Sequence, residues 1–320
     1  TCSNPLYARM NNVNRLINLR LSVGSHQTMQ TLADGILDRT ERDFDRVLVV
    51  GNPEVSDRHV RAWKLAGVDA ERIPISKKVP KSLDRRTCVD VCVSNIAQKT
   101  RLIEGLTRSG IRVLSVGPIS NKYEITKRVL ESGVSILDPM EHHPLLTKVV
   151  NLIAAGKIGS ARILRLEALR HDRGLSDFSL FEGLVNGFTA ANLLLKNANV
   201  KKVFANKIKT GYSIFYATLL TFDNGSTCQL VSGSSAKQGM LEFSINGPAG
   251  MIAFNESGVV DSPSGLELSD TMYSITSVEV LCRTFLDFAR NGVSNSQDLT
   301  KYKVVNAIVE SARQKKQISL

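Results

Sequence analysis

Short apolar runs alternate with amphipathic stretches through the first half of the chain. Residues 47–50 are consecutive apolar residues that end at Gly51, and the stretch after them places Val60, Trp63 and Leu65 on one side of a helix. The alternation continues with strand-like runs at 72–75, 88–93, 112–115 and 134–137 and helix-like stretches at 98–109 and 124–132. This order predicts a doubly wound, Rossmann-like parallel sheet over residues 46–140.

The second half shows the period-two pattern that is typical of half-buried strands. The pattern covers residues 161–169, 203–209, 214–222, 227–233 and 240–245. Asn224-Gly225, between two of these runs, predicts a hairpin with a type I′ turn. Residues 276–290 and 298–313 have the spacing of amphipathic helices that close the domain. Residues 141–320 are therefore predicted to form an α+β domain with an open, mainly antiparallel sheet, and the whole chain to be of the α/β class.

Composition adds limits to this picture. The 320 residues, 42% of them hydrophobic and 22% charged, are enough for two packed cores. Apolar runs stay far below the roughly eighteen residues of a membrane helix, so no membrane insertion is expected. The five cysteines lack the paired spacing of a zinc site, and we expect reduced thiols and no metal.

The net charge of +11 is spread over both halves of the chain. Such a charge fits an acidic small substrate, a polyanionic neighbour such as RNA, or simply a cationic surface in an anion-rich compartment. No base-reading motif accompanies it, so any RNA contact is expected through phosphates, and DNA is not expected as a partner.

Residues 1–45 are predicted to form an N-terminal arm. Residues 1–33 contain no acidic residue, and Arg9, Arg15 and Arg20 are interleaved with polar and apolar residues, as in an organellar transit peptide. This pattern favours a mitochondrial location over a cytoplasmic one. The arm is expected either to dock on a partner chain or RNA, or to fold back as a helix over residues 25–39.

Several segments, taken in their order along the chain, resemble segments of a known protein family. They are Arg58-His59 early in the first helix, Val116-Gly117-Pro118 after the fourth strand, Ala155-Gly156-Lys157-Ile158-Gly159, and the strand and glycine turn at 243–250. Together they resemble the glucose-fructose oxidoreductase, inositol dehydrogenase and rhizopine-catabolism protein (Gfo/Idh/MocA) family over residues 45–320. The resemblance implies a nicotinamide-binding first domain. It also implies a second domain whose sheet carries a substrate cleft on one face and a homodimer interface on the other.

The phosphate-binding loop that the family needs is degenerate here. The matching hexapeptide runs from Gly51 to Ser56 and keeps only its first glycine. Pro53 removes a backbone donor and Glu54 places a negative charge where a pyrophosphate would approach. Ser56 stands in the place of the last glycine, so no cofactor is expected to bind.

The residues after the second strand suggest which cofactor would bind if any did. The acidic residue that holds ribose hydroxyls is replaced by Lys77 and Lys78. Lysines at this position could hold a 2′-phosphate, which favours NADP over NAD. The alternative is a solvated basic loop without a ligand.

The family's acid/base positions also carry other residues. The lysine of its Glu-Lys-Pro tripeptide corresponds to Gly117, its aspartate to Asn186, and its histidine to Thr189 or Ala190. None of these side chains exchanges a proton near neutral pH as imidazole does. The resemblance therefore implies a degenerate member without catalytic residues.

His142 and His143, which follow Glu141, are the remaining candidates for a ligand-binding cleft. With His171 and Asp172 they could supply acid/base groups or metal ligands. Adjacent histidines point in different directions, so a shared metal is not expected.

Three functions remain open from the sequence. The leading hypothesis is a non-catalytic structural or assembly component of a larger complex, specifically a mitochondrial ribonucleoprotein. The first alternative is an NADP-dependent oxidoreductase with unfamiliar donors such as His142, His143 or Tyr123. The second is a sensor that binds a cofactor or metabolite without turnover.

Overall fold

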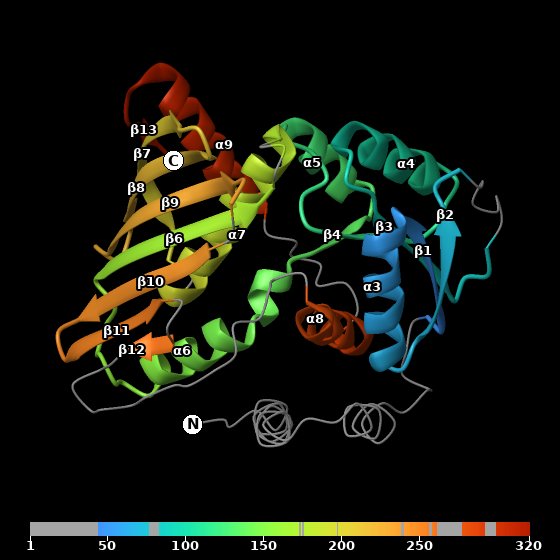
Figure 1. Ribbon diagram of the computed structural model, residues 1–320, viewed down its shortest axis with the longest axis horizontal. Helices are drawn as coiled ribbons and strands as arrows, with labels where there is room; N and C mark the ends of the chain where they lie inside the picture. Colours follow the sequence, from blue (N-terminus) through green and yellow to red (C-terminus); the bar gives the residue numbers. More distant parts are fainter. Residues whose placement is uncertain are drawn as a thin grey trace.

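The structure, a computed structural model, contains two β-sheets with their covering helices, which lie side by side (Figure 1). It describes residues 44–76, 83–172, 174, 176–196, 198–237, 240–255, 258–260, 277–291 and 299–320. Nearly all of the predicted arm, the helix at 25–39, and Lys77 and Lys78 lie outside the described residues.

The first domain is built on a five-stranded parallel sheet with the strand order β2-β1-β3-β4-β5. Its strands are β1 (Arg46–Gly51), β2 (Asp69–Pro74), β3 (Thr87–Cys92), β4 (Val113–Val116) and β5 (Ser135–Leu137). Every residue of β3 is buried, as expected for a central strand covered on both faces. The structure confirms the predicted Rossmann-like sheet.

Helices cover both faces of this sheet. They are α3 (Pro53–Leu65), α4 (Ile96–Arg108) and α5 (Tyr123–Glu131). Residues of α4 and α5 pack with Val89 and Val91 on one face, whereas Trp63 of α3 packs with Val47 and Val49 on the other. The alternate residues of each strand therefore feed two separate cores, as a doubly wound sheet requires.

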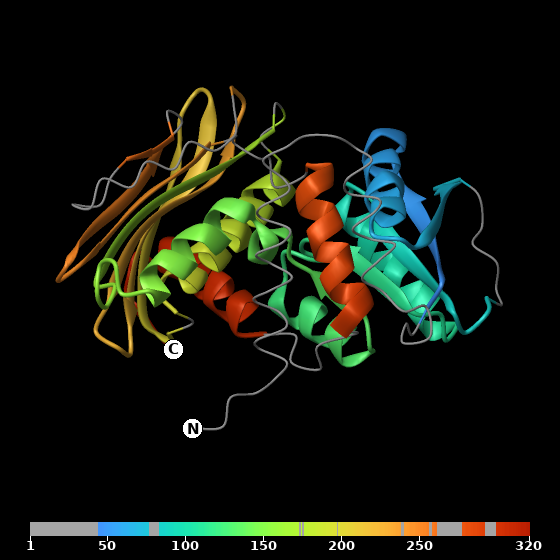
Figure 2. The ribbon, with the colours of Figure 1, turned by 90° about the horizontal axis from the view of Figure 1, so that it is seen from below.

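The helix α8 (Val278–Asn291) differs from its predicted place. The sequence groups it with the second domain, but Phe285 stacks on Trp63 of α3, with ring centroids 4.0 Å apart and planes 4° apart. Figure 2 shows α8 alongside the first domain. Amphipathic spacing indicates that a helix has an apolar face and leaves open which sheet that face covers.

The second domain contains an eight-stranded sheet with the order β12-β11-β10-β6-β9-β8-β7-β13. Its strands are β6 (Ile163–His171), β7 (Val200–Lys209), β8 (Ser213–Phe222), β9 (Thr227–Ser235), β10 (Met240–Gly247), β11 (Gly250–Asn255), β12 (Gly258–Val260) and β13 (Ile318–Ser319). Among the described strands of this sheet, only the pair β6 and β9 is parallel. The prediction of a mainly antiparallel sheet is confirmed.

The inner face of this sheet packs on helices. They are the short helix η2 (Pro139–His142), α6 (Pro144–Ala154), α7 (Asp177–Leu194) and α9 (Leu299–Gln314). The helix α7 is buried along most of its length, and α9 packs against β7. Figure 1 shows α7 and α9 between the sheet and the first domain, so α7 separates the two halves of the molecule.

The predicted hairpin between β8 and β9 forms, but its turn is not of type I′. A type I′ turn needs positive φ at both central residues, and only Gly225 has one, at 78°. The side chain of Asn224 instead accepts a hydrogen bond from Ser226 N at 2.9 Å. This local Asx hydrogen bond stabilises a different turn with the same strand pairing.

No described helix is both long enough and apolar enough to cross a membrane. The four described cysteines, Cys88, Cys92, Cys228 and Cys282, are buried free thiols. Burial raises the pKa of Cys88 to about 12, so this thiol stays protonated and packs as a small apolar group.

Candidate functional site

The connection between β1 and α3 is a single residue, Asn52. A Cβ on Gly51 would lie 2.6 Å from the carbonyl oxygen of Cys92 on the neighbouring strand, so strand packing by itself requires this glycine. Asn52 is the N-cap of α3, and its side-chain oxygen lies 3.4 Å from Ser94 N. Packing in the sheet thus accounts for Gly51, the one glycine of the hexapeptide 51–56.

The polar side chains in the first turn of α3 interact within the helix itself. Pro53 occupies the first turn and lacks an N–H, and Glu54 lies beside it, with its carboxylate 3.9 Å from Arg58. The buried hydroxyl of Ser56 donates to Asn52 O at 2.8 Å, with Pro53 O at 3.1 Å. This helix end offers fewer donors and more negative charge than a phosphate site usually has.

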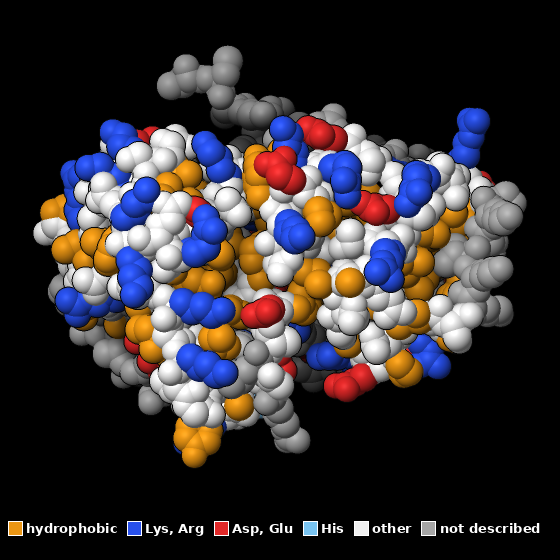
Figure 3. Space-filling model, turned by 90° about the horizontal axis from the view of Figure 1, so that it is seen from above, with side chains coloured by type: hydrophobic (Ala, Val, Ile, Leu, Met, Phe, Trp, Pro, Cys, Tyr) orange, Lys and Arg blue, Asp and Glu red, His pale blue; other side chains and the backbone are white. Residues whose placement is uncertain are grey.

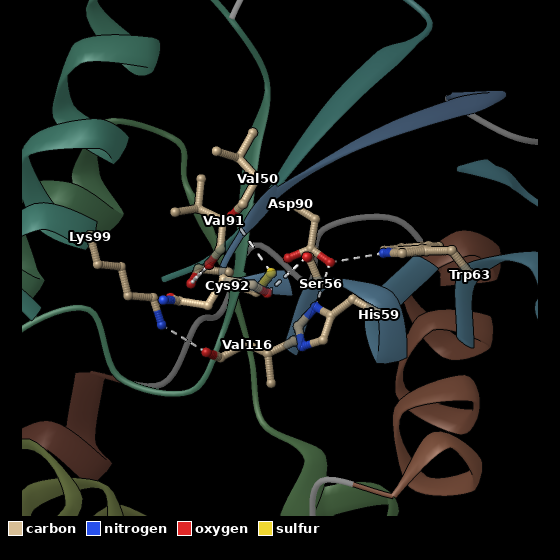
Figure 4. A network of polar contacts seen from close by, with 11 residues as sticks. Val50, Ser56, His59, Trp63, Asp90, Val91, Cys92, Lys99 and Val116 are labelled. Atoms are coloured by element: carbon tan, nitrogen blue, oxygen red, sulfur yellow. Dashed lines mark hydrogen bonds and ion pairs between the residues drawn. The ribbon is translucent and has the colours of Figure 1, made fainter. Parts of the chain in front are cut away.

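A buried polar network joins α3 to the central strand β3 (Figure 4). His59 Nδ1 lies 2.8 Å from Asp90 Oδ2, and Trp63 Nε1 donates to the same oxygen at 2.9 Å. Asp90 is fully buried, and its other oxygen has no hydrogen-bond partner among the described residues. Two donors from one helix therefore fix α3 on the sheet.

Lys99 of α4 supports the turn that contains Gly117. Its amine donates to Val116 O at 2.8 Å (Figure 4). It also donates to Pro118 O at 3.2 Å. The residue is only 2% exposed. Burial lowers the pKa of Lys99 to about 8, although the nearby charge of Glu182 acts in the opposite direction.

Lys99 gives the protein a measurable pH dependence. In the unfolded chain the amine keeps its proton up to about 10.5, but the folded protein releases it near 8. The folded state therefore gains stability as pH rises through this interval, and that gain is lost as pH falls through about 8. The difference in free energy of unfolding between the wild type and Lys99→Met should grow across the interval in denaturant titrations. A constant difference would contradict this assignment.

Gly117 has the left-handed φ of 71° that favours glycine. A Cβ placed there would lie 3.4 Å from a carboxylate oxygen of Glu182 on α7. Glu182 in turn forms an ion pair with Arg170 at the end of β6. A side chain at this position would therefore project toward a carboxylate that already has a partner.

A second charged cluster lies beside the matching positions on α7. Lys301 Nζ of α9 lies 3.0 Å from Asp138 Oδ2 and 3.4 Å from Glu141. Thr189 donates its hydroxyl to the same Asp138 oxygen at 2.7 Å. Burial alone would lower the pKa of Lys301, but the charge of Asp138 holds it above its usual value. Lys301 and Thr189 thus share one carboxylate oxygen of Asp138, and the other oxygen accepts from Met140 N at 3.1 Å.

The other matching residues of α7 lie inside the protein core. Asn186 is 6% exposed, and Ala190 is fully buried. Helical spacing places Asn186 on the same side of α7 as Thr189 and Ala190. Thr189 is the one matching position on α7 whose side chain hydrogen-bonds to a charged group.

The two predicted cleft histidines have separate surroundings. His142 Nε2 lies 4.0 Å from Asp287 of α8, whereas His143 is buried at the start of α6. His171 is exposed at the end of β6, and Asp172 accepts hydrogen bonds from Ser176. Within the described ranges no cluster of three potential metal ligands is found.

The sequence reasoning missed the charged side chains that surround the matching positions. Asp138 directly follows a predicted parallel strand, and this placement at the carboxyl edge of a sheet could have identified it. Lys99, Arg170, Glu182 and Lys301 carry no comparable signal, because their positions depend on how helices pack.

Comparison with known proteins supports the fold. No protein-family description and no curated protein sequence matches the chain. Among solved structures, a myo-inositol dehydrogenase from Corynebacterium glutamicum is 15% identical with a TM-score of 0.63, and the match covers 87% of this chain and 99% of that one.

Two further solved structures were determined with ligands. An inositol dehydrogenase homologue from Azotobacter vinelandii, in complex with NADH and myo-inositol, is 11% identical with a TM-score of 0.66, and the match covers 87% of this chain and 98% of that one. An oxidoreductase from Agrobacterium radiobacter, in complex with NAD+, L-tartaric acid and magnesium, is 15% identical with a TM-score of 0.65 and the same coverage. The chain therefore has the two-domain fold of the Gfo/Idh/MocA-type inositol dehydrogenases.

Proposed function

We propose that the protein is a non-catalytic member of this fold that serves as a structural or assembly component of a larger complex. The observation that carries the proposal is the pairing of charges around the former acid/base positions. Glu182 pairs through Oε1 with Arg170 next to Gly117, while its Oε2 is buried without a hydrogen-bond partner among the described residues, and Lys301 and Thr189 both bind Asp138. Groups paired in this way are poorly placed to exchange protons with a substrate.

The residues at the end of β1 do not fit a nicotinamide dinucleotide. A dinucleotide cradle needs a glycine loop that lets the backbone approach the pyrophosphate. Here one residue joins the strand to the helix, Pro53 removes a donor, and Glu54 adds negative charge. For this reason we assign no reaction step to such a cofactor, although lysines at 77 and 78 would favour NADP if one bound.

The partners belong to the same proposal. The net charge of +11 and the acid-free arm favour a mitochondrial ribonucleoprotein as the larger complex. A homodimer through the open sheet, and a cytoplasmic location, are the alternatives.

One observation favours a second candidate, an NADP-dependent oxidoreductase with altered catalytic residues. The matches cover 98% or more of the enzymes' own chains, and two of those enzymes were solved with NAD+ or NADH. In addition, the amine of Lys99 lies at the turn where the family's lysine is replaced by Gly117. A sensor that binds without turnover would share these features.

A turnover assay separates the oxidoreductase from the two non-catalytic candidates. The purified full chain is incubated with each oxidised and reduced nicotinamide dinucleotide and a panel of polyols and sugar acids, and nicotinamide absorbance is followed. We expect no change above a sample without protein. Turnover that disappears in Lys99→Met would establish the oxidoreductase instead.

A further inference from the structure

Lysines gather in one acid-free segment of the second domain. Residues 183–222 contain five lysines and no acidic residue. Four of the five lie on β7, and Lys201, Lys202, Lys207 and Lys209 are all exposed. This strand therefore carries a dense positive charge along its length.

The C-terminus adds two more lysines at the same place. The strand β13 pairs with β7, with Ile318 opposite Val203, and Leu320 N donates to Lys201 O at 3.0 Å. This pairing brings the exposed Lys315 and Lys316 beside β7. We call Lys201, Lys202, Lys207, Lys209, Lys315 and Lys316 the basic edge.

Two acidic side chains lie near the basic edge, where the charge of Lys201 acts on Asp223 and that of Lys316 on Glu310. Asp223 accepts from Asn199 Nδ2 at 2.9 Å, and this hydrogen bond lowers the pKa of Asp223. Glu310 pairs with Arg313 at 2.6 Å. In the part of the chain that the structure describes, none of the six lysines forms an ion pair. Figure 3 shows Lys and Arg side chains spread over the surface of the sheet domain, at the left of the view.

Exposed aromatic side chains lie beside Lys202 and at the end of β7 that follows Lys209, whereas Lys207 and Lys209 alternate to the face opposite Phe204. Phe204, two residues from Lys202 on the same face of β7, is 39% exposed. Tyr212, at the tip of the hairpin between β7 and β8, is 58% exposed, and Lys237 Nζ lies 4.2 Å from its ring centroid. Lysines that follow a strand beside exposed rings match the requirements of a single nucleic-acid strand, whose phosphates need cations and whose bases stack.

Lysines on an edge strand can also act simply to prevent aggregation. That role explains a few charges on the free part of β7. It does not explain why lysines continue in the segment where β13 already covers the strand, nor the additional Lys315 and Lys316.

We infer that the basic edge binds the phosphate backbone of single-stranded RNA, with Tyr212 as a stacking platform. Contacts of this kind discriminate little between sequences and weaken steeply with salt. The inference is independent of whether the protein has lost catalysis, because no residue of the basic edge belongs to the site at the domain boundary.

Fluorescence anisotropy of a labelled oligouridine, titrated with the full chain at several salt concentrations, tests the inference. Each phosphate contact contributes about 0.7 to the slope of log affinity against log salt. The variant K202Q/K207Q/K209Q should therefore lower the slope by about 2. Tyr212→Ala should weaken binding about tenfold with an unchanged slope.

Matched variants define the contrary results. K64Q/K122Q/K157Q removes the same charge from exposed lysines elsewhere, and R9Q/R15Q/R20Q removes it from the arm. Both should leave most of the slope intact. An equal loss of slope in all three variants would mean that binding depends only on net charge. A loss of slope confined to the arm variant would mean that the arm, and not the basic edge, binds the RNA. Absence of RNA binding, or equally tight and basic-edge-dependent binding of polyglutamate, would overturn the assignment to RNA.

Discussion

Replacing Gly183 by alanine is expected to lower the free energy of unfolding by about 3 kcal/mol or more. A Cβ at this position of α7 would lie 2.7 Å from the carbonyl carbon of Gly233 on β9. The atoms that this Cβ would meet belong to the backbone of Gly233 and cannot rotate away as a side chain could, so the helix must move off the sheet. Because α7 lies between the two halves of the molecule, such a shift would disturb both charged clusters of the site.

Urea unfolding followed by circular dichroism measures this effect. Gly105→Ala is the matched control, since a Cβ there meets no described atom within 4 Å. At this exposed position of α4 that change should stabilise the protein by about 1 kcal/mol, because alanine favours helix. Equal midpoints for Gly183→Ala and the wild type would show that α7 does not seat as closely on β9 as described.

Replacing Lys301 by methionine is expected to cost about 3–5 kcal/mol, because it leaves the buried charge of Asp138 without its cation. Asp138 is 6% exposed, and after the change only the hydroxyl of Thr189 still binds that oxygen. The protein should therefore unfold at a clearly lower denaturant concentration near neutral pH.

A second change at the same cluster tests the cause. Asp138→Asn combined with Lys301→Met removes both charges and should recover part of the lost stability, so the two effects should not add. Lys303→Met, on an exposed position of the same helix, should change stability by less than about 0.5 kcal/mol. Additive effects in the double variant would mean that the amine and the carboxylate do not interact.

Much of the fold follows from local patterns in the sequence. Parallel strands buried on both faces require apolar, β-branched runs such as residues 47–50, and half-buried strands require alternation. Packing of helix on sheet is not encoded in this way. The position of α8 against Trp63 depends on complementary ring surfaces, and the turn at Asn224 depends on a side-chain hydrogen bond that competes with the type I′ geometry.

The site was predicted less completely than the fold. The resemblance indicated Gly117, Asn186, Thr189 and Ala190, and their assignment as former catalytic positions stays a prediction. Asp138 and Lys301 are 163 residues apart, so only the assembled tertiary structure brings them together. The proposed loss of function therefore rests on charge pairs that no sequence motif displays.

Isothermal titration calorimetry of the full chain with NADPH, NADP+, NADH and NAD+ tests the central claim most directly. The arrangement of Pro53, Glu54 and Ser56 predicts no binding at millimolar cofactor. Binding of any of the four tighter than roughly 100 µM, about −5.5 kcal/mol, would contradict the proposal and establish this end of the sheet as a working cofactor site.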